Sequence, residues 1–61
     1  MIKTLFVLNG TEGWEFTVGE EFPRNKQVIR EIYECKERYV VAFRNNSRLI
    51  VKTPHVMTLS E

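Results

Sequence analysis

The chain has 61 residues and a formal net charge of +1, and 43% of its residues are hydrophobic and 28% charged. This length predicts one domain, residues 1–61, and the composition is too hydrophobic for a disordered chain. The single cysteine, Cys35, excludes an internal disulfide, and the single histidine, His55, leaves too few soft ligands for a structural zinc site. We therefore expect a small core that gains from self-association, because short chains bury little of their surface.

Targeting signals are not evident in the chain. No stretch approaches the roughly 20 apolar residues of a membrane span. The apolar run 5–8 is too short for the core of a signal peptide, and Asn9 and Gly10 follow it where a cleavage site would need small residues. With one unpaired cysteine, we expect a cytoplasmic protein.

Charge is unevenly distributed along the chain. Residues 1–22 hold one base and four acids, whereas residues 23–61 hold eight bases and four acids. This polarity predicts either a charged binding surface or two adjacent halves whose surface charges pair.

The first predicted hairpin joins residues 3–8 to residues 14–18. Two connections are possible: a tight two-residue turn at Asn9-Gly10, which pairs Leu5 with Trp14, and a five-residue loop over 9–13. The longer loop, which pairs Leu8 with Trp14, is favoured because it gathers the large apolar side chains on one face, and a slip of one residue would lose that face. The expected face consists of Ile2, Phe6, Leu8, Trp14, Phe16 and Val18.

The middle of the chain is ambiguous. Residues 19–26 are expected to form an irregular segment anchored by Phe22, because Pro23 cannot donate a backbone hydrogen bond to a neighbouring strand. Apolar residues in 27–37 fit a helical stripe, yet they are β-formers alternating with charged residues, so a strand is favoured. The expected strand faces are Val28, Arg30, Ile32 and Glu34 on one side, and Ile29, Glu31, Tyr33 and Cys35 on the other.

The last hairpin is the clearest element. Residues 39–43 and 49–53 meet across a three-residue loop over 45–47, which pairs Arg44 with Arg48. The side chains expected to face the core are Tyr39, Val41, Phe43, Leu49 and Val51. Pro54 is expected to end the strand, and Val56 and Leu59 indicate a short closing strand.

In chain order the sequence contains Gly19-Glu20-Glu21-Phe22, Val28-x-x-x-Ile32, Tyr39–Phe43, a polar turn, Leu49-Ile50-Val51 and Pro54-His55-Val56. This order resembles small SH3-like barrels, the group that includes KOW, Tudor and bacterial Sm-like folds, and short proteins of Gram-positive bacteria and their phages. Residues 39–59 are similar to the last three strands of the bacterial Sm-like RNA chaperone in the order of an apolar strand, a polar turn and a segment with lysine and histidine. An Sm-like protein should also have a helix before its first strand, and the lysine–histidine pair is interrupted here as Lys52-Thr53-Pro54-His55.

We therefore predict an all-β fold, a small SH3-like barrel of about five antiparallel strands. The alternative is an α+β fold of the ββαββ type with residues 24–37 helical.

The residues of an enzyme are nearly absent. Aspartate does not occur, and the glutamates fall at expected surface positions. Cys35 and His55 are the only candidates for a nucleophile and a base, and a lone cysteine near a turn is usually unreactive. We expect no catalytic, metal or cofactor site and no small-molecule substrate.

Two surfaces are candidates for binding. The candidate nucleic-acid-binding residues are Arg30, Arg44, Arg48 and Lys52, although charges on an edge hairpin also serve to prevent edge pairing. The candidate protein interface consists of Leu5, Val7, Val40, Ala42 and Ile50, because strands apolar on both faces are usually covered on both. Trp14 fits the edge of the core better than a ligand platform.

The predicted function is accordingly a non-enzymatic binding module acting through protein contacts, with a homodimer as one form. The alternative is binding of single-stranded RNA or DNA through the basic hairpin face.

Overall fold

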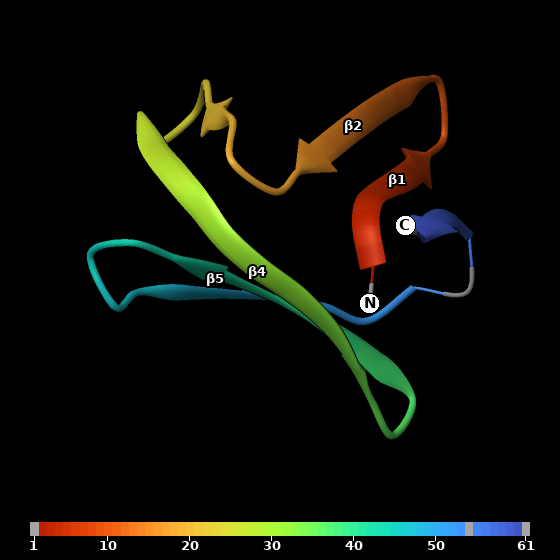
Figure 1. Ribbon diagram of the computed structural model, residues 1–61. Coiled ribbons are helices and arrows are strands. Elements are labelled where there is room, and N and C mark those ends of the chain that lie inside the picture. The colour runs from red at the N-terminus through yellow and green to blue at the C-terminus, as the bar shows by residue number, and fades with distance from the viewer. Residues whose placement is uncertain (1, 54, 61) are drawn as a thin grey trace.

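The computed structural model describes residues 2–53 and 55–60, and every regular element in them is a strand (Figure 1). The strands are β1 (Ile2–Asn9), β2 (Glu12–Thr17), β3 (Glu21–Phe22), β4 (Gln27–Cys35), β5 (Arg38–Phe43), β6 (Arg48–Val51) and β7 (Val56–Ser60). The all-β prediction is confirmed, and the helical alternative for residues 24–37 is wrong. Pro54, expected to end a strand, lies outside the described residues.

The strands form one curled antiparallel sheet. Its main path runs β2-β1-β4-β5-β6, with β3 paired to β4 and β7 paired to β1. In Figure 1 the hairpin of β1 and β2 lies over one side and the β4–β5 pair crosses below it, so the core lies between them. Among the described residues β2 and β6 do not pair with each other, which leaves a half-barrel that is open between them.

The core is built from aromatic and branched side chains of the inner face. Phe22 is 7% exposed, and its ring centroid lies 4.6 Å from that of Phe16 and 6.2 Å from that of Phe43. Phe22 therefore anchors the segment after β2, as expected. The buried cluster comprises Leu5, Val7, Phe16, Phe22, Ile29, Ile32, Val41, Phe43 and Val51.

The turn between β1 and β2 has two residues, Gly10 and Thr11, with Gly10 at a φ of 65°. This turn places Val7 opposite Trp14, whereas the favoured five-residue loop placed Leu8 there. Both registers considered from the sequence are therefore wrong, the favoured one by a single residue. Because side chains alternate along a strand, this slip exchanges the two faces of β1. Leu5 becomes fully buried opposite Phe16, and Leu8 becomes 52% exposed.

A β-bulge reverses the expected alternation in β4. Ile29 pairs with Phe43, but the next pair joins Glu31 to Ala42, so Arg30 is an extra residue. Ile29 and Ile32 consequently both face the core, at 1% and 2% exposed, although the regular strand pattern placed them on opposite faces. The bulge also explains why this segment has the spacing of a helical stripe.

The β5–β6 hairpin has the predicted faces with a shifted register. Val41 pairs with Leu49 instead of Val51, and residues 44–47 connect the two strands, with Asn46 at a φ of 70°. Because the shift moves each partner by two residues, the inward and outward sets are unchanged. The predicted closing strand is confirmed as β7, which pairs along β1.

Candidate binding groove at Trp14

Trp14 lies on β2 at the open side of the half-barrel. Three hollows of the surface share its side chain in their walls, and two of them reach across to β6. The residues that line this opening, here called the Trp14 groove, include Trp14, Phe22, Arg24, Arg48, Leu49 and Lys52. Trp14 also packs against the core cluster, which is the expected place at the core edge.

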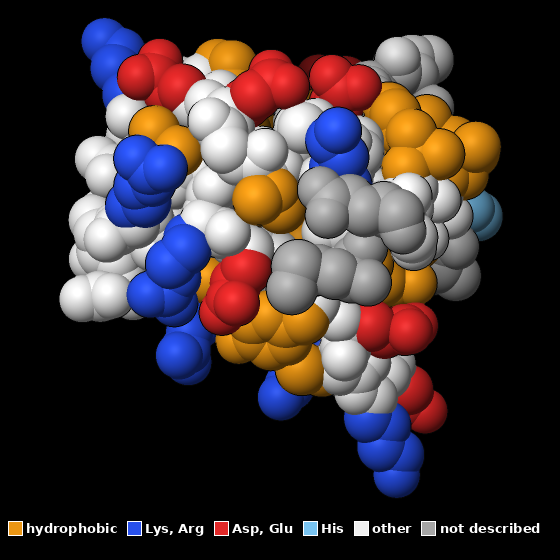
Figure 2. Space-filling model, viewed as in Figure 1, with side chains coloured by type: hydrophobic (Ala, Val, Ile, Leu, Met, Phe, Trp, Pro, Cys, Tyr) orange, Lys and Arg blue, Asp and Glu red, His pale blue; other side chains and the backbone are white. Residues whose placement is uncertain are grey.

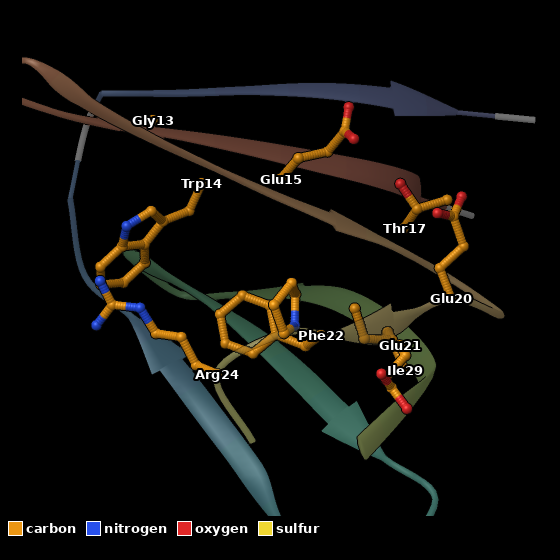
Figure 3. Close-up of a pocket in the computed structure, with 10 residues that line it drawn as sticks. Gly13, Trp14, Glu15, Thr17, Glu20, Glu21, Phe22, Arg24 and Ile29 are labelled. Carbon is orange, nitrogen blue, oxygen red and sulfur yellow. The ribbon is translucent and has the colours of Figure 1, made fainter. Parts of the chain in front are cut away.

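Arg24 covers the indole ring of Trp14. Its guanidinium carbon lies 4.3 Å from the ring centroid, within the range of a cation–π interaction (Figure 3). The short turn after β3 holds Arg24 in place, because Lys26 N–H donates to the Phe22 carbonyl at 2.8 Å. Asn25 Oδ1 accepts from Gln27 N–H at 3.0 Å and closes the same turn.

The pocket beside Trp14 and Phe22 has opposite charges at its two ends. Its volume is about 450 Å³, with Arg24 at one end and exposed glutamates towards the other, among them Glu20 and Glu21 (Figure 3). Figure 2 shows several carboxylates along the top margin and several lysine and arginine side chains at the left, with acidic and basic side chains interspersed over the lower part of this face. Within residues 2–53 and 55–60, the ion pair that forms joins Arg30 to Glu31, both from the second half of the sequence.

The edge of β6 that faces away from β5 is unpaired among the described residues. Phe43 N–H donates to the Ser47 carbonyl at 2.9 Å, which fixes the hydrogen-bonded positions of this ladder. Because such positions alternate in an antiparallel pair, the backbone groups of Arg48 and Ile50 point away from β5. The groove thus has free backbone donors and acceptors along β6 and an aromatic ring on β2.

The predicted basic set is only partly brought together. Arg44, Arg48 and Lys52 are exposed, and Arg48 and Lys52 line the Trp14 groove from the two ends of β6. Arg44 lies in the β5–β6 turn. Arg30 lies in the β4 bulge, where its guanidinium is 3.7 Å from the Glu31 carboxylate.

Arg24 is the groove residue that the sequence reading missed. The only signal was its position two residues after Phe22, the predicted anchor of an irregular segment, in a chain with one tryptophan. The residues around Arg24 do not predict a contact with Trp14, because the contact joins two separate elements, the turn after β3 and strand β2.

The predicted protein interface is corrected by burial within the chain. Leu5 is fully buried and Val7 is 5% exposed, because the slipped β1 register turns both into the core. Val40 and Ala42 are 4% and 1% exposed; they lie on the central strand β5, where side chains of β4 and β6 flank them on both sides. Of the five predicted residues, only Ile50 is exposed, at 44%.

Among the described residues, no three histidine, cysteine, aspartate or glutamate side chains gather closely enough to hold a metal ion. The described part of the chain also has no helix with the length and apolar character needed to cross a membrane. Searches of protein-family models, of curated proteins and of solved structures each found no match to this chain.

Proposed function

We propose that this protein is a non-enzymatic binding module of the SH3-like barrel type that holds an extended segment of a partner protein in the Trp14 groove. The observation that carries the proposal is the unpaired edge of β6 lying across from Trp14. A cytoplasmic location belongs to the same proposal and is supported by the single free cysteine.

The free edge of β6 favours a partner in β conformation. Backbone groups of Arg48 and Ile50 that point away from β5 are available to pair with an added strand, a recognised mode of peptide binding. Every second side chain of that strand would then face Trp14 and Leu49, where an apolar residue fits best. The added strand would occupy the opening between β2 and β6.

The side chains at the rim favour an acidic partner. Arg48 and Lys52 project from the outward face of β6, and Arg24 lies beside Trp14. Carboxylates at alternate positions of the added strand would therefore meet cations, while apolar residues meet the groove floor.

Single-stranded nucleic acid is the second candidate, since Trp14 with Arg24, Arg48 and Lys52 combines an aromatic ring with cations. A base that stacks on Trp14 would have to share or displace the guanidinium that already covers the ring. An added strand requires no such displacement, so the protein partner is favoured.

Fluorescence of Trp14, the only tryptophan of the chain, is a direct probe of the groove. The test is a titration of the full chain with a synthetic octapeptide of alternating glutamate and valine, which should give a saturable change. Arg48→Ala should weaken binding by about three- to thirtyfold. Arg44→Ala is the matched control, because Arg44 carries the same charge outside the groove.

Two further ligands separate the candidate partners. An octapeptide of alternating lysine and valine should bind much more weakly, because it places cations beside Arg48 and Lys52. Saturable binding of oligothymidylate without binding of the acidic peptide would replace the proposal with the nucleic-acid reading. No response to any of these ligands at millimolar concentration would contradict both.

A further inference from the structure

The outer edge of β7 is a second strand edge without a partner, separate from the edge of β6. In the described residues β7 pairs only with β1, and Leu8 N–H donates to the His55 carbonyl at 2.8 Å. By the alternation of an antiparallel ladder, Met57 and Leu59 also direct their backbone groups towards β1. The backbone groups of Val56 and Thr58 therefore point away from the sheet, without a partner strand.

The side chains of β7 lack the charges and the proline that usually protect an edge, although the β1–β7 ladder has a register shift between Ile2 and Thr4 of β1. Natural edge strands are protected from pairing by lysine, proline, inward charges or bulges. Of the other exposed edges, β2 carries Glu12 and Glu15, and β6 carries Arg48. By contrast, residues 56–60 contain no charge and no proline.

Apolar side chains are exposed beside this edge. Met57 is 64% exposed, Leu59 56% and Leu8 52%. Met57 lies opposite the half-buried Phe6, so all four side chains share the outer face of β1 and β7. Figure 2 shows hydrophobic side chains at the margin of the molecule next to the histidine, which precedes β7. A strand that is uncharged and apolar on one face would match this edge.

We propose that β7 pairs antiparallel with β7 of a second copy of this chain, with the two-fold axis at Thr58. This register pairs the outward backbone groups of Thr58 with those of Thr58 of the partner subunit, and it brings Val56 opposite Ser60 of the partner subunit. It also sets Met57 directly against Leu59 of the partner subunit on the outer face. The strand is complementary to itself in charge, in hydrogen bonding and in apolar pattern, which is what a two-fold interface requires.

Dimer formation joins two sheets across β7 and leaves β6 and the Trp14 groove untouched. The inference is therefore independent of the proposed function. A contact made mainly by one strand from each copy belongs to the small, weak class of interfaces, so we expect dissociation at micromolar to millimolar concentration.

Sedimentation equilibrium of the full chain over that concentration range tests the proposal. The wild type should show a reversible monomer–dimer equilibrium. In the double variant Met57→Lys/Leu59→Lys, each new cation faces another across the two-fold axis, and the dissociation constant should rise about ten- to a hundredfold. The double variant Met57→Glu/Leu59→Lys sets opposite charges against each other in the same register and should retain much more of the dimer.

Circular dichroism and thermal unfolding at low concentration show whether both double variants fold. If either double variant does not fold, the single variant Thr58→Pro takes the place of both. It removes an outward N–H that makes no hydrogen bond to β1, so it should abolish the dimer while the monomer remains folded. A wild type that stays monomeric at millimolar concentration overturns the proposal. So does a dimer that the two lysines leave unchanged, and equal dissociation of the two double variants contradicts the register.

Discussion

The guanidinium carbon of Arg24 lies 4.3 Å from the ring centroid of Trp14 and joins the turn after β3 to strand β2. Replacement of Arg24 by alanine should lower the free energy of unfolding by about 0.5–1 kcal/mol, the range of an exposed cation–π contact. Urea denaturation followed by circular dichroism measures the loss. Arg44→Ala is the control and should stay within about 0.5 kcal/mol of the wild type. An equal effect of the two substitutions would show that the contact contributes no stability.

The register of β1 can be tested with two leucines of the same strand. Leu5 is fully buried and Leu8 is 52% exposed, so Leu5→Ala should cost about 2–5 kcal/mol and Leu8→Ala less than about 1 kcal/mol. A domain of this size has little stability to lose, and Leu5→Ala should leave much of the chain unfolded at room temperature. Thermal unfolding of both variants provides the comparison. The five-residue loop predicts the opposite order.

Glu37 adopts a φ of 60° in the turn between β4 and β5, a conformation that costs a non-glycine residue about 1–2 kcal/mol. Glu37→Gly should therefore raise the free energy of unfolding by about 0.5–1 kcal/mol, despite the greater freedom of glycine in the unfolded chain. Lys36→Gly, at the neighbouring turn position with an ordinary φ, should lower it. Chemical denaturation of the two variants measures both, and stabilisation by Lys36→Gly would contradict this account.

The pKa of Tyr39 is raised above its ordinary value near 10.0, first by desolvation and then by a hydrogen bond to Glu34 and the negative charge of that residue. Glu34 lies directly across the β4–β5 pair. Because the folded state holds this proton to higher pH than the unfolded chain, the stabilisation is complete below about pH 10 and is lost as pH rises through the folded-state pKa.

A spectrophotometric titration of tyrosinate in Tyr33→Phe protein isolates this group, because the chain has two tyrosines. Glu34→Gln in the same background should lower the midpoint, since it removes the charge while desolvation remains. A midpoint at or below 10 in the parent variant would contradict the raised pKa.

Composition and alternation predicted the class of fold well. β-forming residues interrupted by turn residues predicted the antiparallel all-β structure, the last hairpin with its inward set, and the closing strand. Phe22 was identified as an anchor because a large aromatic residue in a polar, irregular segment has few other roles. These features depend on local preference and on burial of apolar side chains, which a sequence displays directly.

Register was decided only in three dimensions. The slip of one residue in the first hairpin and the bulge at Arg30 each reverse a strand face, and each is selected by how Phe16, Phe22 and Phe43 pack together. Those rings come from three separate parts of the chain, so no local pattern contains their arrangement. The burial of Leu5 and Val7, two of the five predicted interface residues, follows from the same slip, whereas Val40 and Ala42 keep the predicted outward face and are buried between β4 and β6.

The candidate site shows the same division between features that the sequence predicts and features that only the tertiary structure decides. The sequence by itself predicted a small all-β chain with cations on its last hairpin. Tertiary structure decided that Arg24 meets Trp14, that the edge of β6 lies across from that pair, and that Leu8, Met57 and Leu59 are exposed beside an uncharged edge. The physical reason is that side-chain chemistry and local preference for strand or turn belong to each residue and its neighbours in the sequence. A binding surface instead depends on which strand edges remain unpaired when the sheet has curled.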